Sequence, residues 1–112
     1  YIIGDKVLKS IASTLKSHVK NDEFCGRYGG EEFIVIMKDT DNNINERLEN
    51  IRATIENNKI EIDEKNYINV TVSIGATRMD FVGKNLEGNI AVADKALYIA
   101  KNKGKNRIEF AE

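Results

Sequence analysis

Two short apolar runs joined by a pair of glycines constrain the fold of this chain more than any other feature. The first run covers residues 23–26 and the second covers residues 33–37. Glycine adopts the positive φ of a tight turn without steric cost, so this stretch predicts a β-hairpin. Two acids, Glu31 and Glu32, stand directly after the glycines. The turn is therefore either a corner for a metal ion and phosphates or a plain hairpin with two solvated glutamates.

Length and charge limit the classes of function. The chain has 112 residues, of which 31% are charged, and its net charge is −1. This length fits one domain, and the balanced charge gives no field that would draw it to nucleic acid or to an anionic membrane. A single cysteine cannot form an internal disulfide, which fits a reducing compartment. No apolar run reaches the roughly 18 residues of a membrane span, so we expect a cytoplasmic domain without direct membrane insertion.

The spacing of apolar residues predicts an alternation of helices and strands. A helical period is found over residues 5–21, 44–58 and 89–103. Strands are expected at residues 23–28, 32–37, 60–62, 67–78 and 107–110. Apolar residues on both faces of the second strand predict that it is central and covered on both sides. The stretch 67–78 is expected to be the longest strand.

Several residues also have an ordinary structural interpretation. Asp5 can cap a helix start by accepting from free amides. His18 is expected to be a surface residue at a helix end. Cys25 lies in a strand without a basic neighbour, which favours a small buried residue over a nucleophile. Gly104 is expected to end the last helix in a left-handed conformation. The lysines around it either interact with the helix dipole or form a cationic clamp for phosphates.

Four motifs, in the right order, resemble the GGDEF-domain family, the diguanylate cyclases. They are residues 27–33 (Arg-Tyr-Gly-Gly-Glu-Glu-Phe), the Gly4-Asp5 pair, the strand residues 70–75 and the helix and turn residues 93–107. Because they extend over essentially the whole chain, residues 1–112 are identified as one partial GGDEF domain. The resemblance implies an α/β (α+β) palm of the nucleotidyl-cyclase or ferredoxin-like type. Its central, mainly antiparallel sheet would be flanked by helices.

The resemblance implies an activity within a signalling protein. Two GTP molecules would condense into cyclic di-GMP with release of pyrophosphate, assisted by Mg²⁺ or Mn²⁺. Each of two facing domains would hold one GTP, so a homodimer is the expected catalytic unit. An upstream sensory or receiver domain would bring the two together, including in the cytoplasmic part of a membrane-bound sensor. The alternative is a catalytically inactive GGDEF domain that serves as a nucleotide-binding or dimerisation module.

The resemblance assigns the chemistry to the hairpin. Glu31 would ligate the metal and help to deprotonate the attacking 3′-hydroxyl, and Glu32 would support the metal. Gly29 and Gly30 would admit the phosphates to the backbone.

The resemblance assigns substrate binding to both ends of the chain. Asp5 would accept hydrogen bonds from N1 and N2 of guanine. Lys101 and Lys105 would hold the phosphates. Lys105 stands where an arginine is more usual in the family, which keeps the charge but loses the planar fork.

Two departures from the family pattern modify these expectations. Tyr1 falls where the family has a histidine, and the family's first strand, which carries a metal-binding aspartate, is not in this sequence. We therefore expect a fragment with an open seam in its sheet and with weak or no activity by itself. Lys20 and Glu23 fall on the family's Arg-x-x-Asp product site. Without the arginine fork, we expect no allosteric product site there.

Overall fold

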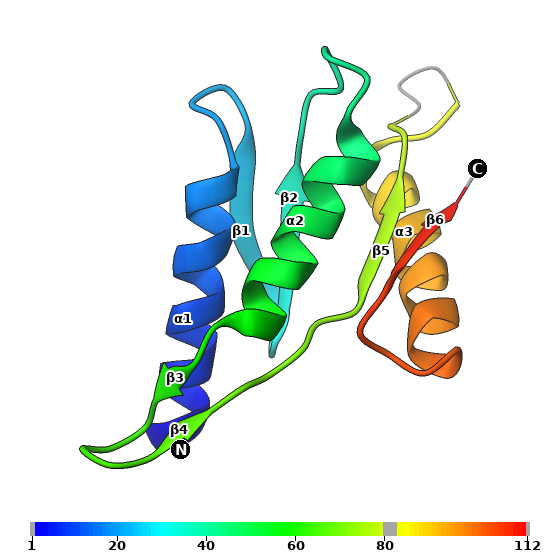
Figure 1. Cartoon of the computed structure of the whole chain (residues 1–112). Coiled ribbons are helices and arrows are strands. Elements are labelled where there is room, and N and C mark those ends of the chain that lie inside the picture. The colour runs from blue at the N-terminus through cyan, green and yellow to red at the C-terminus, as the bar shows by residue number, and fades with distance from the viewer. Residues whose placement is uncertain (1, 80–82, 112) are drawn as a thin grey trace. The chain divides into compact units, whose positions relative to one another are not determined.

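The computed structural model of the chain describes residues 2–79 and 83–111 (Figure 1). In that part of the chain, three helices and six strands alternate along the sequence. They fall into two compact units, Tyr1–Val70 and Thr71–Glu112, which we call unit 1 and unit 2. None of the helices in the described part combines the length and the hydropathy that crossing a bilayer requires.

Unit 1 has its core between two helices and a short strand. Its elements are α1 (Ile2–His18), β1 (Phe24–Gly29), β2 (Glu32–Ile36), α2 (Ile44–Asn57), β3 (Ile60–Glu61) and β4 (Tyr67–Ile68). α1 packs against α2 and β3. The buried apolar side chains of the described residues in this unit come from these three elements: Leu15, Leu48, Ile51, Ile55 and Ile60. Polar bonds add to this packing, since Asn58 Nδ2 donates to Ser10 Oγ at 3.0 Å and Lys6 Nζ donates to the Ile62 carbonyl at 2.7 Å.

The predicted hairpin is confirmed. β1 and β2 pair antiparallel, and Gly29 stands opposite Glu32 beside the turn. Gly30 has a φ of +50°, which is the conformation that called for glycine. The register shifts between Arg27 and Gly29, so an extra residue bulges out of β1 next to the turn.

Unit 2 is a parallel strand pair covered by one helix. Its elements are β5 (Ile74–Thr77), α3 (Leu86–Asn102) and β6 (Ile108–Ala111), and α3 packs against both strands. A Cβ atom on Gly75 would lie 2.2 Å from the Ala93 carbonyl oxygen and 2.3 Å from the Leu97 nitrogen. β5 and α3 therefore approach each other at a point where only glycine fits.

Both ends of α3 have polar caps. The Asn85 side chain accepts from the Gly88 amide at 2.8 Å. At the other end, the amide of Lys105 donates to the Ala100 carbonyl at 3.0 Å, and the amide of the preceding glycine donates to the Lys101 carbonyl. This pair of bonds is a Schellman motif, and Gly104 has the predicted positive φ, +123°.

The strand pairing differs from the single central sheet expected from the sequence. The described strands form three two-stranded sheets, β1–β2, β3–β4 and β5–β6. The class, α+β, is as predicted. Two such sheets form one only when their free edges pair, directly or through another strand, and the described residues show no such pairing. β2 is at most half-buried, so the prediction that it is covered on both sides is wrong.

Several element bounds differ from the predictions. The long strand expected over residues 67–78 is two short strands, because β4 bonds to β3 and β5 bonds to β6. α1 already begins at Ile2, so Asp5 lies within its first turn and is not its N-cap. α3 begins at Leu86, three residues before the expected start, because Asn85 supplies the cap.

Candidate functional site

The turn of the hairpin exposes backbone and carboxylates together. A Cβ atom built on Gly29 or Gly30 would have no atom within 4 Å, so the main chain is open to a bulky ligand. Glu31 and Glu32 are both exposed. The Arg27 guanidinium is hydrogen-bonded to the turn. Its Nε and Nη2 both donate to the Gly30 carbonyl, the former at 2.7 Å.

The two carboxylates suit a hard divalent cation. Glu32 belongs to β2 and Glu31 to the turn, so they are adjacent but not equivalent. Among the described residues, no group of three or more His, Cys, Asp or Glu side chains converges on one point. Mg²⁺ commonly takes one or two carboxylates from a protein and completes its shell with phosphates and water. The turn fits that mode of binding, in which the substrate supplies ligands.

A cleft of about 350 Å³ lies between α1 and the hairpin. It is lined by Asp5, Leu8, Lys9, Ala12, Lys16, Cys25, Gly26, Arg27 and Phe33. Asp5 is the acidic residue of this lining, and apolar side chains from α1 and β2 line the same cleft. This combination suits a flat ring that presents N–H donors. Arg27 lines the cleft and also bonds to the Gly30 carbonyl, so the cleft and the turn share a residue.

Of the residues that line this cleft, Asp5 was predicted from the sequence as a binding residue, whereas most of the others were not. Lys9 lies one helical turn beyond Asp5, a spacing that places two side chains on one face of a helix. That signal was available. The contribution of Phe33 and Cys25 depends on how the hairpin packs on α1, which no local pattern shows. Burial raises the pKa of the Cys25 thiol, which agrees with the prediction that it is not a nucleophile.

The lysine-rich end of α3 belongs to unit 2. Lys101 and Lys105 are exposed, whereas Lys103 forms an ion pair with Glu109 at 3.2 Å. Lys105 and Asn106 both have left-handed backbones, with φ of 63° and 50°. Such a conformation is unusual for residues with side chains and is found where the surroundings fix it. The meeting of these lysines with Glu31 stays a prediction.

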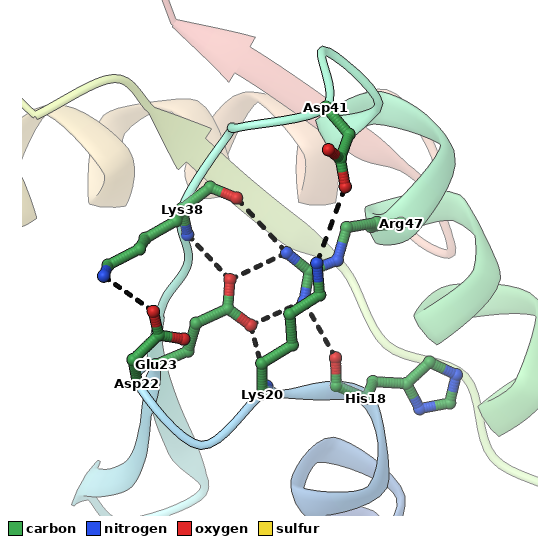
Figure 2. A network of polar contacts seen from close by, with 7 residues as sticks. All are labelled: His18, Lys20, Asp22, Glu23, Lys38, Asp41 and Arg47. Atoms are coloured by element: carbon green, nitrogen blue, oxygen red, sulfur yellow. Dashed lines mark hydrogen bonds and ion pairs between the residues drawn. The ribbon is translucent and has the colours of Figure 1, made fainter.

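Glu23 is one of the two residues that fall on the family's Arg-x-x-Asp product site. Its carboxylate is hydrogen-bonded to other groups of the protein (Figure 2). Its carboxylate accepts from the amides of Lys20 and Lys38 at 2.8 and 2.7 Å. It also accepts from Arg47 Nη1 and Nη2 at 2.8 and 2.6 Å. These four bonds use the acceptor capacity of a carboxylate. Lys20 Nζ lies 3.7 Å from Asp41. The absence of a product site at these two positions stays a prediction.

The surroundings of Glu23 change its ionisation. The Arg47 guanidinium lowers the pKa of Glu23 from 4.5 to about 2, and the two backbone amides add to this effect. The same hydrogen bonds raise the pKa of Arg47. No local pattern predicts this pair, because its partners lie 24 residues apart.

Comparison with known proteins shows the family to which the chain belongs. Residues 2–107 match the family model described as diguanylate cyclase, GGDEF domain. The chain is 39% identical over 110 residues to diguanylate cyclase A of Treponema denticola, covering 97% of the chain and 29% of that protein. It is 36% identical over 108 residues to diguanylate cyclase DosC of Escherichia coli K12, covering 95% and 23%. The chain thus spans about a quarter of the length of these curated relatives.

Solved structures share the fold. Diguanylate cyclase SiaD of Pseudomonas aeruginosa, solved with its activator SiaC, has a TM-score of 0.85 and 30% identity, covering 96% of this chain and 41% of SiaD. The GGDEF domain of DgcB from Caulobacter crescentus, solved with c-di-GMP, has a TM-score of 0.85 and 29% identity, covering 96% and 64%. The predicted α+β class is therefore that of these domains.

Proposed function

Because the chain belongs to the GGDEF family of diguanylate cyclase domains, we propose that it is the catalytic domain of a signalling protein that makes cyclic di-GMP from two GTP. The observation that carries the proposal is the open Gly29-Gly30 turn with Glu31 beside it, connected through Arg27 to the cleft that contains Asp5. A nucleotide spanning the two would place its base in the cleft and its phosphates at the turn.

The hairpin residues would act on the phosphates and the attacking hydroxyl. In each half-reaction the 3′-oxygen of one GTP forms a bond to the α-phosphorus of the other, and the bond from that phosphorus to the β-phosphate oxygen breaks. Glu31 would receive the proton of the 3′-hydroxyl. The main chain at Gly29 and Gly30 leaves room for the phosphates, since a Cβ atom at either position would have no atom within 4 Å.

A divalent ion fits the turn, and Glu31 with Glu32 would hold it. When bound, Mg²⁺ or Mn²⁺ lowers the pKa of a coordinated hydroxyl and neutralises charge on the phosphates. Lys101 and Lys105 would add cationic groups to the triphosphate. Asp5 would select guanine by accepting from its N1 and N2 hydrogens, a donor pair that adenine lacks in this arrangement.

The partners follow from the reaction. Each product molecule contains two nucleotides, so we propose that two copies of the domain face each other, each with one GTP. An upstream sensory or receiver domain would control their encounter.

The second candidate is a GGDEF domain that binds nucleotide or dimerises without catalysis. It is favoured by the altered position Tyr1 and by the short described sheets. The intact glycine pair and both acids of the turn favour the enzyme.

Replacement of the turn acid in the intact protein separates the two candidates. With GTP and Mg²⁺, we expect the wild type to form cyclic di-GMP and Glu31→Ala to lose this activity by at least about a thousandfold, since the metal ligand and the base disappear together. Glu64→Ala, an exposed acid in the loop between β3 and β4, is the matched control and should keep wild-type activity. Synthesis by Glu31→Ala at the wild-type rate would remove Glu31 from the mechanism. A folded wild-type protein that binds GTP but makes no product would favour the second candidate.

A further inference from the structure

The hydrogen-bond network at the open end of the hairpin joins all the larger elements of unit 1 (Figure 2). Glu23 precedes β1, Lys38 follows β2, and Arg47 lies on α2. Arg47 donates to the Glu23 carboxylate and to the carbonyl of His18, the last residue of α1, at 3.0 Å. It also donates to the Lys38 carbonyl at 3.4 Å. One guanidinium thus contacts the end of α1 and both sides of the hairpin.

The Glu23–Arg47 pair at the centre of this network is shielded from water, whereas the lysines and aspartates around it are exposed. The Glu23 side chain has 0% of its surface exposed and the Arg47 side chain 12%. Screening by solvent and salt is weak at such a site, and two parallel bonds fix the relative orientation of the pair. A buried pair of this kind need not add net stability, because desolvation offsets much of the attraction. Its geometry is nevertheless strongly directional.

The hairpin depends on this network because it contributes little to the core. The buried apolar side chains of unit 1, in the part that the structure describes, lie on α1, α2 and β3. The apolar residues of β2 are only half-buried. Apolar packing therefore holds the helices together. Directional polar bonds at Glu23 and Lys38 hold the open end of the hairpin, which we call its root, against them.

We propose that Arg47 and Glu23 are positioning residues for the nucleotide reaction, an inference that rests on the proposed function. The pair fixes the angle between the hairpin and α1. It thereby sets the width of the cleft that contains Asp5 and the place of Glu31 relative to it. Neither residue contacts substrate in this scheme. Displacement of reacting groups by about 1 Å can cost on the order of a hundredfold in rate, so a loosened root has a large effect at the turn.

Arg47→Met in the intact protein is the direct test, because it keeps an unbranched apolar stem and removes every donor. We expect kcat/KM for GTP to fall by at least about 30-fold at a temperature where circular dichroism shows the variant to be folded. Arg47→Lys keeps the charge but loses the fork, and we expect an intermediate loss. If Arg47→Lys keeps more activity than Arg47→Met, the loss in Arg47→Met is due to the missing polar bonds and not to altered packing alone.

Arg52→Met is the matched control. Arg52 also lies on α2 and is also ion-paired, but the two carboxylates in these pairs, Glu49 and Glu56, belong to the same helix. We expect its kcat/KM to stay within about threefold of the wild type, since surface pairs within a helix contribute little. A larger loss in this control would show that any weakening of α2 lowers activity, which would overturn the assignment of the effect to Arg47.

The outcomes distinguish this inference from the proposed function. If the wild type makes cyclic di-GMP and folded Arg47→Met stays within threefold of it, the positioning role is wrong and the proposed function stands. If the wild type makes none, the proposed function fails first. Should Arg47→Met not fold, Glu23→Gln replaces it, because it keeps the shape of the side chain and removes its charge. The same threefold limit then applies.

Discussion

Glu23 has the environment that differs most from what its place in the chain suggests. By sequence it is an acid before a strand, and in the structure it is a buried carboxylate with four donors. Its partner Arg47 lies on the next helix along the chain. Local patterns cannot show this pairing, because it depends on the packing of α2 beside the root of the hairpin.

The lowered pKa of Glu23 makes unit 1 sensitive to acid. Its pKa falls from 4.5 to about 2 on folding, so the stabilisation it gives is complete above the higher value. It is lost as the pH falls from about 5 towards 2, because the unfolded chain then takes up the proton first. We expect Glu23→Gln to be less stable than the wild type near neutral pH. The difference in free energy of unfolding should shrink as the pH is lowered through this range.

Urea denaturation of both proteins at pH 6 and pH 3 measures this difference. Asp22, whose carboxylate pairs with Lys38 at the surface, provides a control through Asp22→Asn. A surface pair should give a small difference at either pH. A gap between the wild type and Glu23→Gln that is equally large at both pH values would show that the carboxylate does not titrate as proposed.

At the scale of elements, the sequence predicts best what is encoded locally. The turn at Gly30, the apolar period of α2 and the stop at Gly104 were all predicted, because each depends on neighbouring residues. The stretch 67–78 was not, because its alternation fits a strand whichever partner it has. Its two ends bond to different strands, β3 and β6, and only tertiary structure determines that change of partner.

The contact between β5 and α3 gives a prediction about stability. Gly75→Ala would place a methyl group 2.2 Å from the Ala93 carbonyl oxygen, a backbone atom that cannot swing aside. We expect this change to destabilise unit 2 by about 2–4 kcal/mol, the range of overpacking and backbone displacement.

Gly4→Ala is the control for this substitution. Gly4 lies in α1, and a Cβ there would have no atom within 4 Å. We expect it to leave stability unchanged or to raise it by up to about 1 kcal/mol, since alanine is the better helix former. Chemical denaturation monitored by circular dichroism gives both values. A Gly75→Ala protein as stable as the wild type would mean that β5 and α3 are not as close as described.

For the whole molecule, the sequence predicted the family and the class of fold, because four motifs extend over both units. The structure adds the cleft beside Asp5, the open turn and the network behind it, all within unit 1. Lys101 and Lys105 belong to unit 2. The proposed function requires that Glu31 at the turn and Asp5 in the cleft, both in unit 1, act on one GTP molecule, and this requirement is its central claim.

Nucleotide affinity in variants of the turn and of the cleft tests that claim most directly. Affinity for a non-hydrolysable GTP analogue and for the matching ATP analogue, each with Mg²⁺, would be measured by calorimetry in the intact wild type, Glu31→Gln and Asp5→Asn. If both groups act on one nucleotide, both variants should bind the GTP analogue at least about tenfold more weakly, and Asp5→Asn alone should lose the preference for GTP over ATP. Wild-type affinity for the GTP analogue in either variant would contradict the account.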